Sequence, residues 1–157
     1  MSTLVTSDWE RPFTLSLKLE EVLPEEYRVI SLFADVLPAG GTCPAYPFGG
    51  FVINFNVSTR IHRDGEDLRF CVVLVLTDGC EGGDLCFLEL GLRLGLRHGD
   101  IVVFRSDILS HFNLHFKGKR VSLVLHTDKA GMEWVKDRNG WEKSTFFNMS
   151  YHGGGDL

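Results

Sequence analysis

Long apolar runs are missing from this sequence, since no stretch approaches the roughly 18 residues that a membrane-spanning helix needs. The first residues also lack the basic segment and apolar core of a secretory signal peptide. Repeats and low-complexity linkers are absent as well. We therefore expect an intracellular protein with no membrane contact, folded as one domain over residues 1–157.

Cysteine is scarce, and its spacing excludes the usual zinc patterns. The four cysteines are Cys43, Cys71, Cys80 and Cys86, and no two of them form a CxxC pair. Cys71 and Cys86 stand in apolar runs, as buried free thiols do. We expect all four thiols to be unpaired, because the expected compartment is reducing and a chain of this length needs no disulfide to fold.

An excess of positive charge is also lacking. The formal net charge is −5, which argues against a large nucleic-acid surface. The charge is uneven, however, since residues 117–143 hold seven Lys/Arg against four acids. This distribution predicts a local basic edge on an acidic protein, with a solvated surface of mixed charge as the alternative.

The hydrophobic pattern predicts a mainly β, α+β fold. Alternating apolar residues favour a strand over residues 13–23, and Pro24 followed by helical spacing predicts a helix over 24–37. From residue 51 to about 127, six to eight short strands separated by Gly/Asp turns indicate a sandwich or barrel. The helix should cover one sheet, and a second short helix is expected near 131–137.

His62, Asp64 and His111 form the most informative constellation. If the strand phase of residues 51–57 continues, His62 and Asp64 point to the same face. A histidine from a later strand would complete two imidazoles and one carboxylate, the ligand set of non-haem Fe(II) sites with open positions for substrate and O₂. The alternative is a hydrogen-bonded His62–Asp64 pair beside a core histidine.

Arg120 and Ser122 share a face of a later strand and suit an anion. A buried guanidinium binds a carboxylate through two parallel hydrogen bonds, and a hydroxyl adds a donor. We predict that they hold the far carboxylate of a 2-oxoacid; the alternative is an exposed arginine beside Lys117 and Lys119. Arg60 lies two residues before His62 and so on the same face, where it could contact the 2-oxoacid co-substrate or a substrate anion, or form a structural salt bridge.

Two further residues have the phase of a pocket wall. Asn54 lies on the polar face of residues 51–57, where it could bind substrate or hold loop backbone. His126 shares the face of Arg120 and Ser122, which predicts a contact with substrate or support of the metal site.

These motifs resemble a known family. Residues 62–67 (HRDGED), 82–85 (GGDL), 99–106 (GDIVVFRS), 110–113 (SHFN) and 120–129 (RVSLVLHTDK) are similar to 2-oxoglutarate/Fe(II) dioxygenases. More narrowly, they resemble the TET/JBP group of nucleobase oxygenases, particularly the short fungal-type members. The resemblance covers residues 51–129 or so.

The resemblance implies a double-stranded β-helix that uses Fe(II), 2-oxoglutarate and O₂. It assigns iron to the two histidines and Asp64, and the co-substrate to Arg120 and Ser122. It assigns a contact with the substrate base to Asp67, three residues after the metal aspartate, and a contact with the base or the co-substrate to His126. The implied reaction oxidises the methyl group of a methylated base such as 5-methylcytosine in DNA, which would suit a nuclear location.

Two other functions remain open from the residues alone. A dioxygenase of the same fold could hydroxylate a small molecule or a protein side chain. A non-catalytic β-barrel could bind a ligand without iron. The sequence leaves the oligomeric state undetermined.

Overall fold

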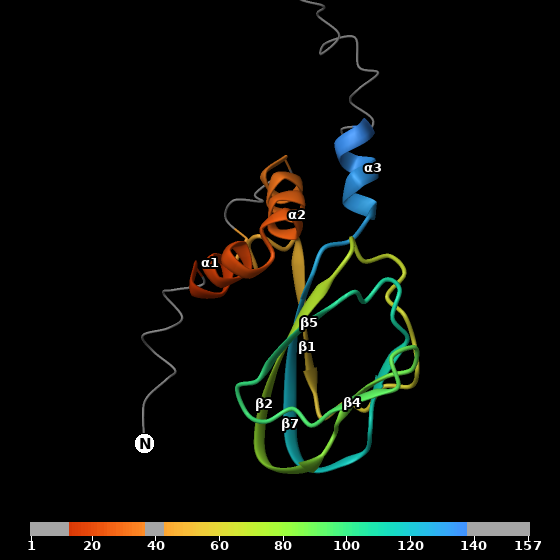
Figure 1. Cartoon of the computed structure of the whole chain (residues 1–157). Helices are drawn as coiled ribbons and strands as arrows, with labels where there is room; N and C mark the ends of the chain where they lie inside the picture. The colour runs from red at the N-terminus through yellow and green to blue at the C-terminus, as the bar shows by residue number, and fades with distance from the viewer. Residues whose placement is uncertain (1–12, 37–42, 138–157) are drawn as a thin grey trace, which may run out of the picture.

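The computed structural model describes residues 13–36 and 43–137 of the 157-residue chain. It contains seven strands and three helices in the described part (Figure 1). Their bounds are α1 (Phe13–Val22), α2 (Pro24–Val36), β1 (Gly50–Phe55), β2 (Cys71–Gly82), β3 (Leu85–Phe87), β4 (Leu92–Leu94), β5 (Ile101–Phe104), β6 (His111–Asn113), β7 (Phe116–His126) and α3 (Ala130–Asp137). No described helix is long and apolar enough to cross a membrane.

The two sheets are antiparallel and carry the site between them. The larger has the order β1-β7-β2-β5 and the smaller the order β4-β3-β6. An isolated bridge between His62 and His111 extends the smaller sheet beyond β6. This arrangement confirms the expected mainly β, jelly-roll architecture, with its strands running from residue 50 to 126.

Two apolar clusters hold these layers together. Between the sheets, Val73 and Val75 of β2 pack with Phe87 and Phe104, whose rings meet edge to face at 4.8 Å. On the other side of the larger sheet, Ile30 of α2 joins a cluster with Val72, Phe48 and Leu125. The helices therefore cover one end of the outer face of the sheet, as Figure 1 shows.

The predicted strand over residues 13–23 is wrong, because Phe13–Val22 is the helix α1. Leu19 is buried in the cluster below the helices, and Lys18 pairs with Glu21 one turn further along at 2.8 Å. Leu, Lys and Glu are all good helix formers, which outweighs a short alternation of apolar residues. The helix predicted over 24–37 is confirmed as α2, and the one near 131–137 as α3.

Candidate functional site

A cavity of about 280 Å³ opens between the two sheets and is near the lower limit for small-molecule sites. The larger sheet contributes alternate residues of β1, β2 and β7, and the smaller sheet contributes residues of β3 and β6. Of the nine residues predicted for the site, eight line this cavity: Asn54, His62, Asp64, Asp67, His111, Arg120, Ser122 and His126.

Arg60 is the exception. Its side chain is exposed and does not line the cavity. The prediction that residues 51–64 continue as one strand is wrong, because β1 ends at Phe55 and Asn56 adopts a positive φ of 52°. The backbone carbonyl of Arg60 lies 2.7 Å from His62 Nδ1 instead, so this residue reaches the site through its main chain.

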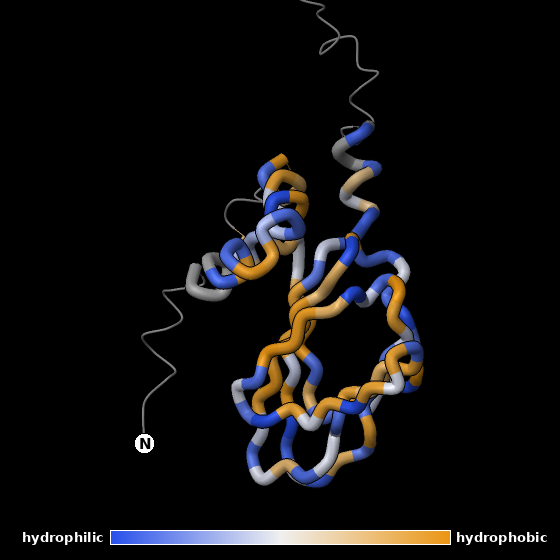
Figure 2. The backbone as a smooth tube through the Cα atoms, in the orientation of Figure 1, coloured by the Kyte–Doolittle hydropathy of each residue, from blue (hydrophilic) through white to orange (hydrophobic). Residues whose placement is uncertain are grey.

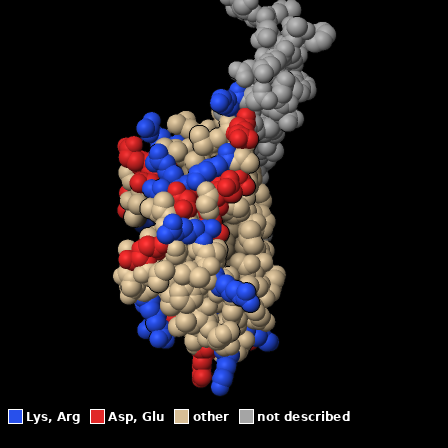
Figure 3. All heavy atoms as spheres, turned by 90° about the vertical axis from the view of Figure 1, so that its right-hand side faces the viewer, with Lys and Arg blue, Asp and Glu red and all other residues tan. Residues whose placement is uncertain are grey.

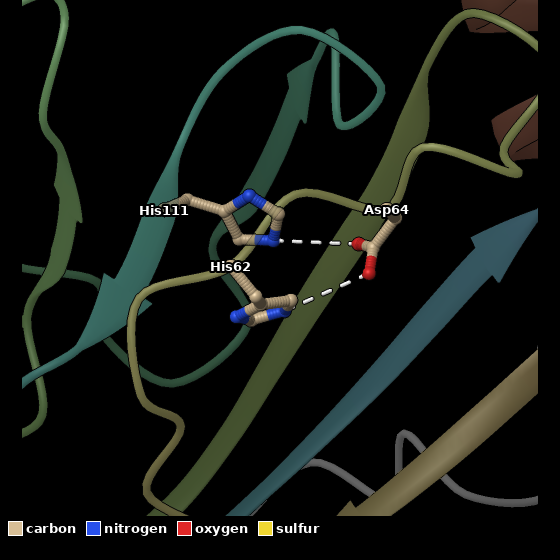
Figure 4. Close-up of side chains that lie close together, drawn as sticks. All are labelled: His62, Asp64 and His111. Atoms are coloured by element: carbon tan, nitrogen blue, oxygen red, sulfur yellow. Dashed lines mark ion pairs between the residues drawn. The ribbon is translucent and has the colours of Figure 1, made fainter.

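The three predicted metal ligands converge in the cavity. Their ligand atoms all lie within 4.8 Å of one another. His111 Nε2 is 3.4 Å from one oxygen of Asp64, and His62 Nε2 is 3.7 Å from the other (Figure 4). The two imidazole rings lie 4.3 Å apart.

Backbone hydrogen bonds fix both histidines in the form that a metal requires. His62 Nδ1 lies against the Arg60 carbonyl, and His111 Nδ1 lies 3.0 Å from the Leu109 carbonyl. A carbonyl only accepts, so each Nδ1 carries the proton and donates it. Nε2 of each ring then points toward Asp64, in the position from which metal-binding histidines contact their ion.

The backbone also sets the relative position of these ligands. His62 and His111 exchange two main-chain hydrogen bonds, of 3.1 and 2.9 Å, across the isolated bridge. The N–H of Asp64 donates to the Ser106 carbonyl at 3.0 Å. The Phe104 ring packs edge to face on His111 at 4.8 Å, which limits the freedom of that imidazole. The donor set and its rigid support therefore fit an Fe(II) ion.

Charge interactions shift the pKa values of two ligands. The hydrogen bond from His111 holds the pKa of Asp64 below its ordinary value, against the opposing effect of burial. Burial alone would lower the pKa of His111, but the hydrogen bonds to Asp64 and the Leu109 carbonyl and the nearby carboxylates raise it above 6.5.

We expect metal affinity to fall as the pH drops through the raised pKa of His111, because a proton competes for Nε2. The stability of the metal-free protein should change with pH in the opposite direction. The raised pKa of His111 contributes stability that is fully present below the unfolded value of 6.5 and is lost as the pH rises through the folded value. Co(II) titrations and thermal melts of the metal-free protein between pH 5.5 and about 8 measure both. Parallel trends would contradict this assignment.

Arg120 is buried at 7% exposure and has no acidic partner among the described residues. Its guanidinium carbon lies 5.9 Å from the Phe116 ring centre. Gly83, at φ +78°, lets the side chain pass, since a Cβ there would lie 3.3 Å from Arg120 Cδ. Burial lowers the pKa of this guanidinium. An unpaired cation inside a cavity is a site for an anion.

Ser122 and Asn54 stand beside this cation. Ser122 follows Arg120 by two residues on β7 and is buried, so both face the cavity. Asn54 of β1 is its register partner across the strand pair. The anion predicted at Arg120 would therefore find a hydroxyl and an amide within the same wall.

Asp67 and His126 form a connected pair in the opposite part of the wall. Ser106 Oγ donates to one oxygen of Asp67 at 2.6 Å, and His126 Nδ1 lies 3.2 Å from the other. Burial raises the pKa of Asp67, although both contacts oppose the shift. Both carboxylate oxygens thus have protein partners, which suits Asp67 to orienting His126.

Sequence reasoning did not predict two sets of side-chain contacts that support the cavity. Asn113 Oδ1 accepts from the N–H and the hydroxyl of Thr59 at 2.8 and 2.7 Å, and thereby fixes the loop before His62. Ser106 is fully buried against Asp67. These bonds join residues 54 and 39 positions apart, and no local pattern reports such contacts.

Comparisons with known proteins support the fold at low sequence identity. No family model matches the chain, and no curated protein matches it either. Among solved structures, NgTET1 in complex with 5mC DNA superposes with a TM-score of 0.67 at 14% identity, over 84% of this chain and 56% of that one. This chain therefore spans little more than half the length of that structure.

Two further structures match less well. One is an oxidoreductase of the 2OG-Fe(II) oxygenase family from Burkholderia pseudomallei, with a TM-score of 0.43 and 21% identity over 49% of this chain and 44% of that one. The other is a Pseudomonas putida prolyl-4-hydroxylase, with a TM-score of 0.41 and 20% identity over 76% and 79%. The superposition on NgTET1 shows that this chain shares the fold of that protein.

Proposed function

We propose that this protein is an Fe(II)- and 2-oxoglutarate-dependent dioxygenase. One observation carries the proposal: a group of two histidines and one aspartate shares a cavity with a buried arginine that has no described acidic partner. A metal site alone would suit many functions. The added anion site matches a co-substrate that binds metal at one end and carries a free carboxylate at the other.

Each side chain has a defined task in this proposal. His62 and His111 offer Nε2 and Asp64 offers a carboxylate oxygen, which leaves one face of the ion open. Arg120 and Ser122 bind the distal carboxylate of 2-oxoglutarate. When bound, the iron supplies the activation of O₂ and the oxidation of a substrate C–H bond, while 2-oxoglutarate is converted to succinate and CO₂. Phe104 and Leu85 contribute apolar surface to the wall of the cavity.

We further propose that the substrate is the methyl group of a methylated nucleobase, such as 5-methylcytosine in DNA. The motif resemblance over residues 51–129 and the fold shared with NgTET1 support this choice. Asn54 and His126 supply hydrogen-bonding groups in the cavity wall, where the edge of a base would need them. A base in a duplex must be flipped out to reach such a cavity. DNA as substrate would also favour a nuclear location.

The basic residues of the segment 117–143 do not form one continuous edge along the described part of the chain. Lys119 lies in the first half of β7 and Lys129 follows its end, and the strand from residue 119 to 126 alone spans about 23 Å. Lys129 Nζ donates to the Gly65 carbonyl at 2.6 Å and so belongs to the loop of the metal ligands. On the face shown in Figure 3, Lys and Arg alternate with Asp and Glu. DNA contacts would therefore be few and dispersed.

Incubation of the protein with methylated DNA, Fe(II), 2-oxoglutarate and O₂ tests this proposal by mass spectrometry. We expect succinate and a hydroxymethylated base. Replacing Lys117, Lys119 and Lys136 with alanine should weaken DNA binding and reduce its salt dependence by about 0.9 in log–log slope for each phosphate that is no longer neutralised. Lys18→Ala with Arg28→Ala, on the helices, is the matched control and should leave both unchanged.

The result separates two candidate functions. Succinate formed without any change in the DNA would overturn the nucleobase assignment and retain the oxygenase. The mixed charge of the face in Figure 3 and the net charge of −5 favour that second candidate, hydroxylation of a small molecule or protein side chain. Absence of succinate under every condition would overturn the oxygenase itself.

A further inference from the structure

The turn between β3 and β4 carries a single charged side chain. Residues 88–91 form this turn, with a hydrogen bond of 3.2 Å from the Gly91 N–H to the Leu88 carbonyl. Glu89 is the only charged residue of the turn, and Leu88 and Leu90 on either side of it are exposed. In Figure 2 the tube around β4 changes repeatedly between hydrophobic and hydrophilic colours. The turn therefore presents one carboxylate, and the partners of that carboxylate identify its role.

Both oxygens of the Glu89 carboxylate accept hydrogen bonds from the segments that carry the predicted metal ligands. Oε1 accepts from Nη2 of Arg63 at 2.6 Å, and Oε2 accepts from the backbone N–H of Ser110 at 2.8 Å. Arg63 stands between two of the ligands in the sequence, and Ser110 directly precedes the third. One carboxylate thus contacts a direct neighbour of each of the three ligands.

Arg63 and Ser110 also contact each other. Nε of Arg63 donates to Oγ of Ser110 at 2.8 Å, and the N–H of Leu88 donates to the Ser110 carbonyl at 2.9 Å. Hydrogen bonds between charged partners are shorter and stronger than those between neutral groups. The outer clamp, as we call Arg63, Glu89 and Ser110, is therefore a closed ring of three hydrogen bonds that a fourth bond ties to the turn.

The outer clamp lies on the opposite side of the smaller sheet from the cavity. His62 and His111 face each other across the isolated bridge, and both line the cavity. Adjacent residues of a strand point to opposite faces, so Arg63 and Ser110 face each other on the outer side. The clamp can therefore hold the two backbones while both imidazoles remain free to bind an ion.

The segment that carries His62 and Asp64 needs such a support. β1 ends at Phe55 and β2 begins at Cys71, so both ligands lie outside the named strands. Among the described residues, the segment pairs with the smaller sheet only through the isolated bridge to His111, which has two main-chain hydrogen bonds. A single bridge leaves the segment free to rotate about these two bonds. A side-chain contact next to the ligands restricts that rotation.

The outer clamp is better suited to positioning than to stabilising the fold. The side chains of Arg63 and Glu89 are 53% and 32% exposed, and ion pairs with such exposure contribute little to folding. Hydrogen bonds from Ser110 and Arg63 lower the pKa of Glu89 to about 2, so the carboxylate is ionised at neutral pH. An ionised carboxylate accepts at both oxygens, whereas an amide has one accepting oxygen.

We propose that Glu89 is a positioning residue for the metal site, which acts through Arg63 and Ser110 to hold the three ligands in one arrangement. The inference rests on the proposed function, because it assigns Glu89 a role toward the bound metal. Metal affinity then depends on a residue of a surface turn that contacts no ligand. Loss of a group that orients a metal ligand lowers affinity by about 10- to 100-fold, and an indirect contact should act at the lower end of that range.

Amide hydrogen exchange of the metal-free protein and Co(II) titration of the full chain test the inference. In Glu89→Ala we expect the amides of His62 and His111, which donate across the bridge, to exchange about 10-fold faster. Co(II) should bind about 10-fold more weakly and with a changed visible absorption spectrum. Arg63→Met should show the same changes. The double variant should lose little more affinity than either single variant, because the two side chains act as one unit.

Glu66→Gln is the matched control. Glu66 lies two residues after Asp64, is exposed, and takes part in none of the ion pairs among the described residues. Its replacement removes the same charge near the metal without touching the clamp, so exchange rates and spectrum should match the wild type. Glu89→Gln keeps one accepting oxygen and should give intermediate values. The amides of Val73 and Val75, in the central strand β2, report that each variant stays folded.

The outcomes separate the inference from the proposed function. A wild type that binds no Co(II) would overturn the proposed function and the inference with it. If the wild type binds Co(II), equal affinity and an unchanged spectrum in Glu89→Ala and Arg63→Met would overturn the inference alone. Equal losses of affinity in Glu66→Gln and Glu89→Ala would also overturn it, because they would assign the effect to net charge rather than to the outer clamp.

Discussion

Replacement of Asp64 with alanine is expected to abolish iron binding and 2-oxoglutarate turnover together. Asp64 supplies the single carboxylate of the three grouped ligands, and both imidazoles turn Nε2 toward it. Without it, two neutral nitrogens remain. Loss of a hydrogen bond that orients a metal ligand lowers metal affinity by about 10- to 100-fold. Loss of the ligand itself should therefore lower the affinity by more than about 100-fold. Metal content after anaerobic reconstitution, and succinate formation, measure the effect.

His115→Ala is the matched control for a variant of the metal site. His115 follows His111 by four residues, is exposed, and does not line the cavity. The His115→Ala protein should bind iron and form succinate as the wild type does. An Asp64→Ala protein that retains one Fe(II) and its turnover would show that the three residues are a hydrogen-bonded cluster rather than a metal site.

Arg120→Met is expected to weaken 2-oxoglutarate binding and to stabilise the protein without ligand. The bound carboxylate would lose a buried charged partner, which costs about 2 kcal/mol or more, or about 30-fold in affinity. The free protein would lose a buried cation that has no described acidic partner. Replacing buried charge with an apolar side chain should raise the free energy of unfolding by about 1–2 kcal/mol. Calorimetric titration and urea unfolding measure the two effects.

Weaker binding of 2-oxoglutarate together with a higher free energy of unfolding distinguishes a binding role of Arg120 from a structural one. Lys119→Met is the control, because Lys119 lies one residue away on β7 and is 77% exposed. It should change neither quantity. Arg120→Lys keeps the charge but loses the two-pronged geometry, so its affinity should be intermediate. An Arg120→Met protein that binds 2-oxoglutarate normally, or that unfolds more easily, would contradict the assignment of this residue.

Much of the fold follows from local sequence patterns, whereas α1 does not. The strands between residues 50 and 126 have β-branched runs and Gly turns, which are strong local signals. Phe13–Val22 alternates like a strand yet forms a helix, because its residues favour helix and Leu19 packs under α2. A ten-residue pattern is too short to distinguish the two-residue period of a strand from the 3.6-residue period of a helix.

His62, Asp64 and His111 come together in the structure, although one step of the prediction that grouped them was wrong. His62 and Asp64 were expected to share a face because one strand would run through residue 64. The strand ends at Phe55, and the bridge to His111 returns His62 to strand geometry. The spacing of two was a sound guide at that point, but it failed for Arg60, which precedes the bridge and is exposed.

Supporting contacts lie beyond what the sequence can reveal. The bond between Thr59 and Asn113 and the bond between Ser106 and Asp67 depend on how the sheets close over the cavity. The absence of an acidic partner for Arg120 among the described residues is likewise a property of the packed structure. These contacts hold together a cavity that contains both the grouped His62, Asp64 and His111 and the buried cation of Arg120.

An anaerobic calorimetric titration of the full chain, first with Fe(II) and then with 2-oxoglutarate, tests whether those two sites act on one ligand. We predict one Fe(II) per chain, followed by one 2-oxoglutarate whose binding requires the metal and weakens in Arg120→Met. Binding of 2-oxoglutarate that is equally strong with and without iron, or in wild type and Arg120→Met alike, would contradict the proposed site.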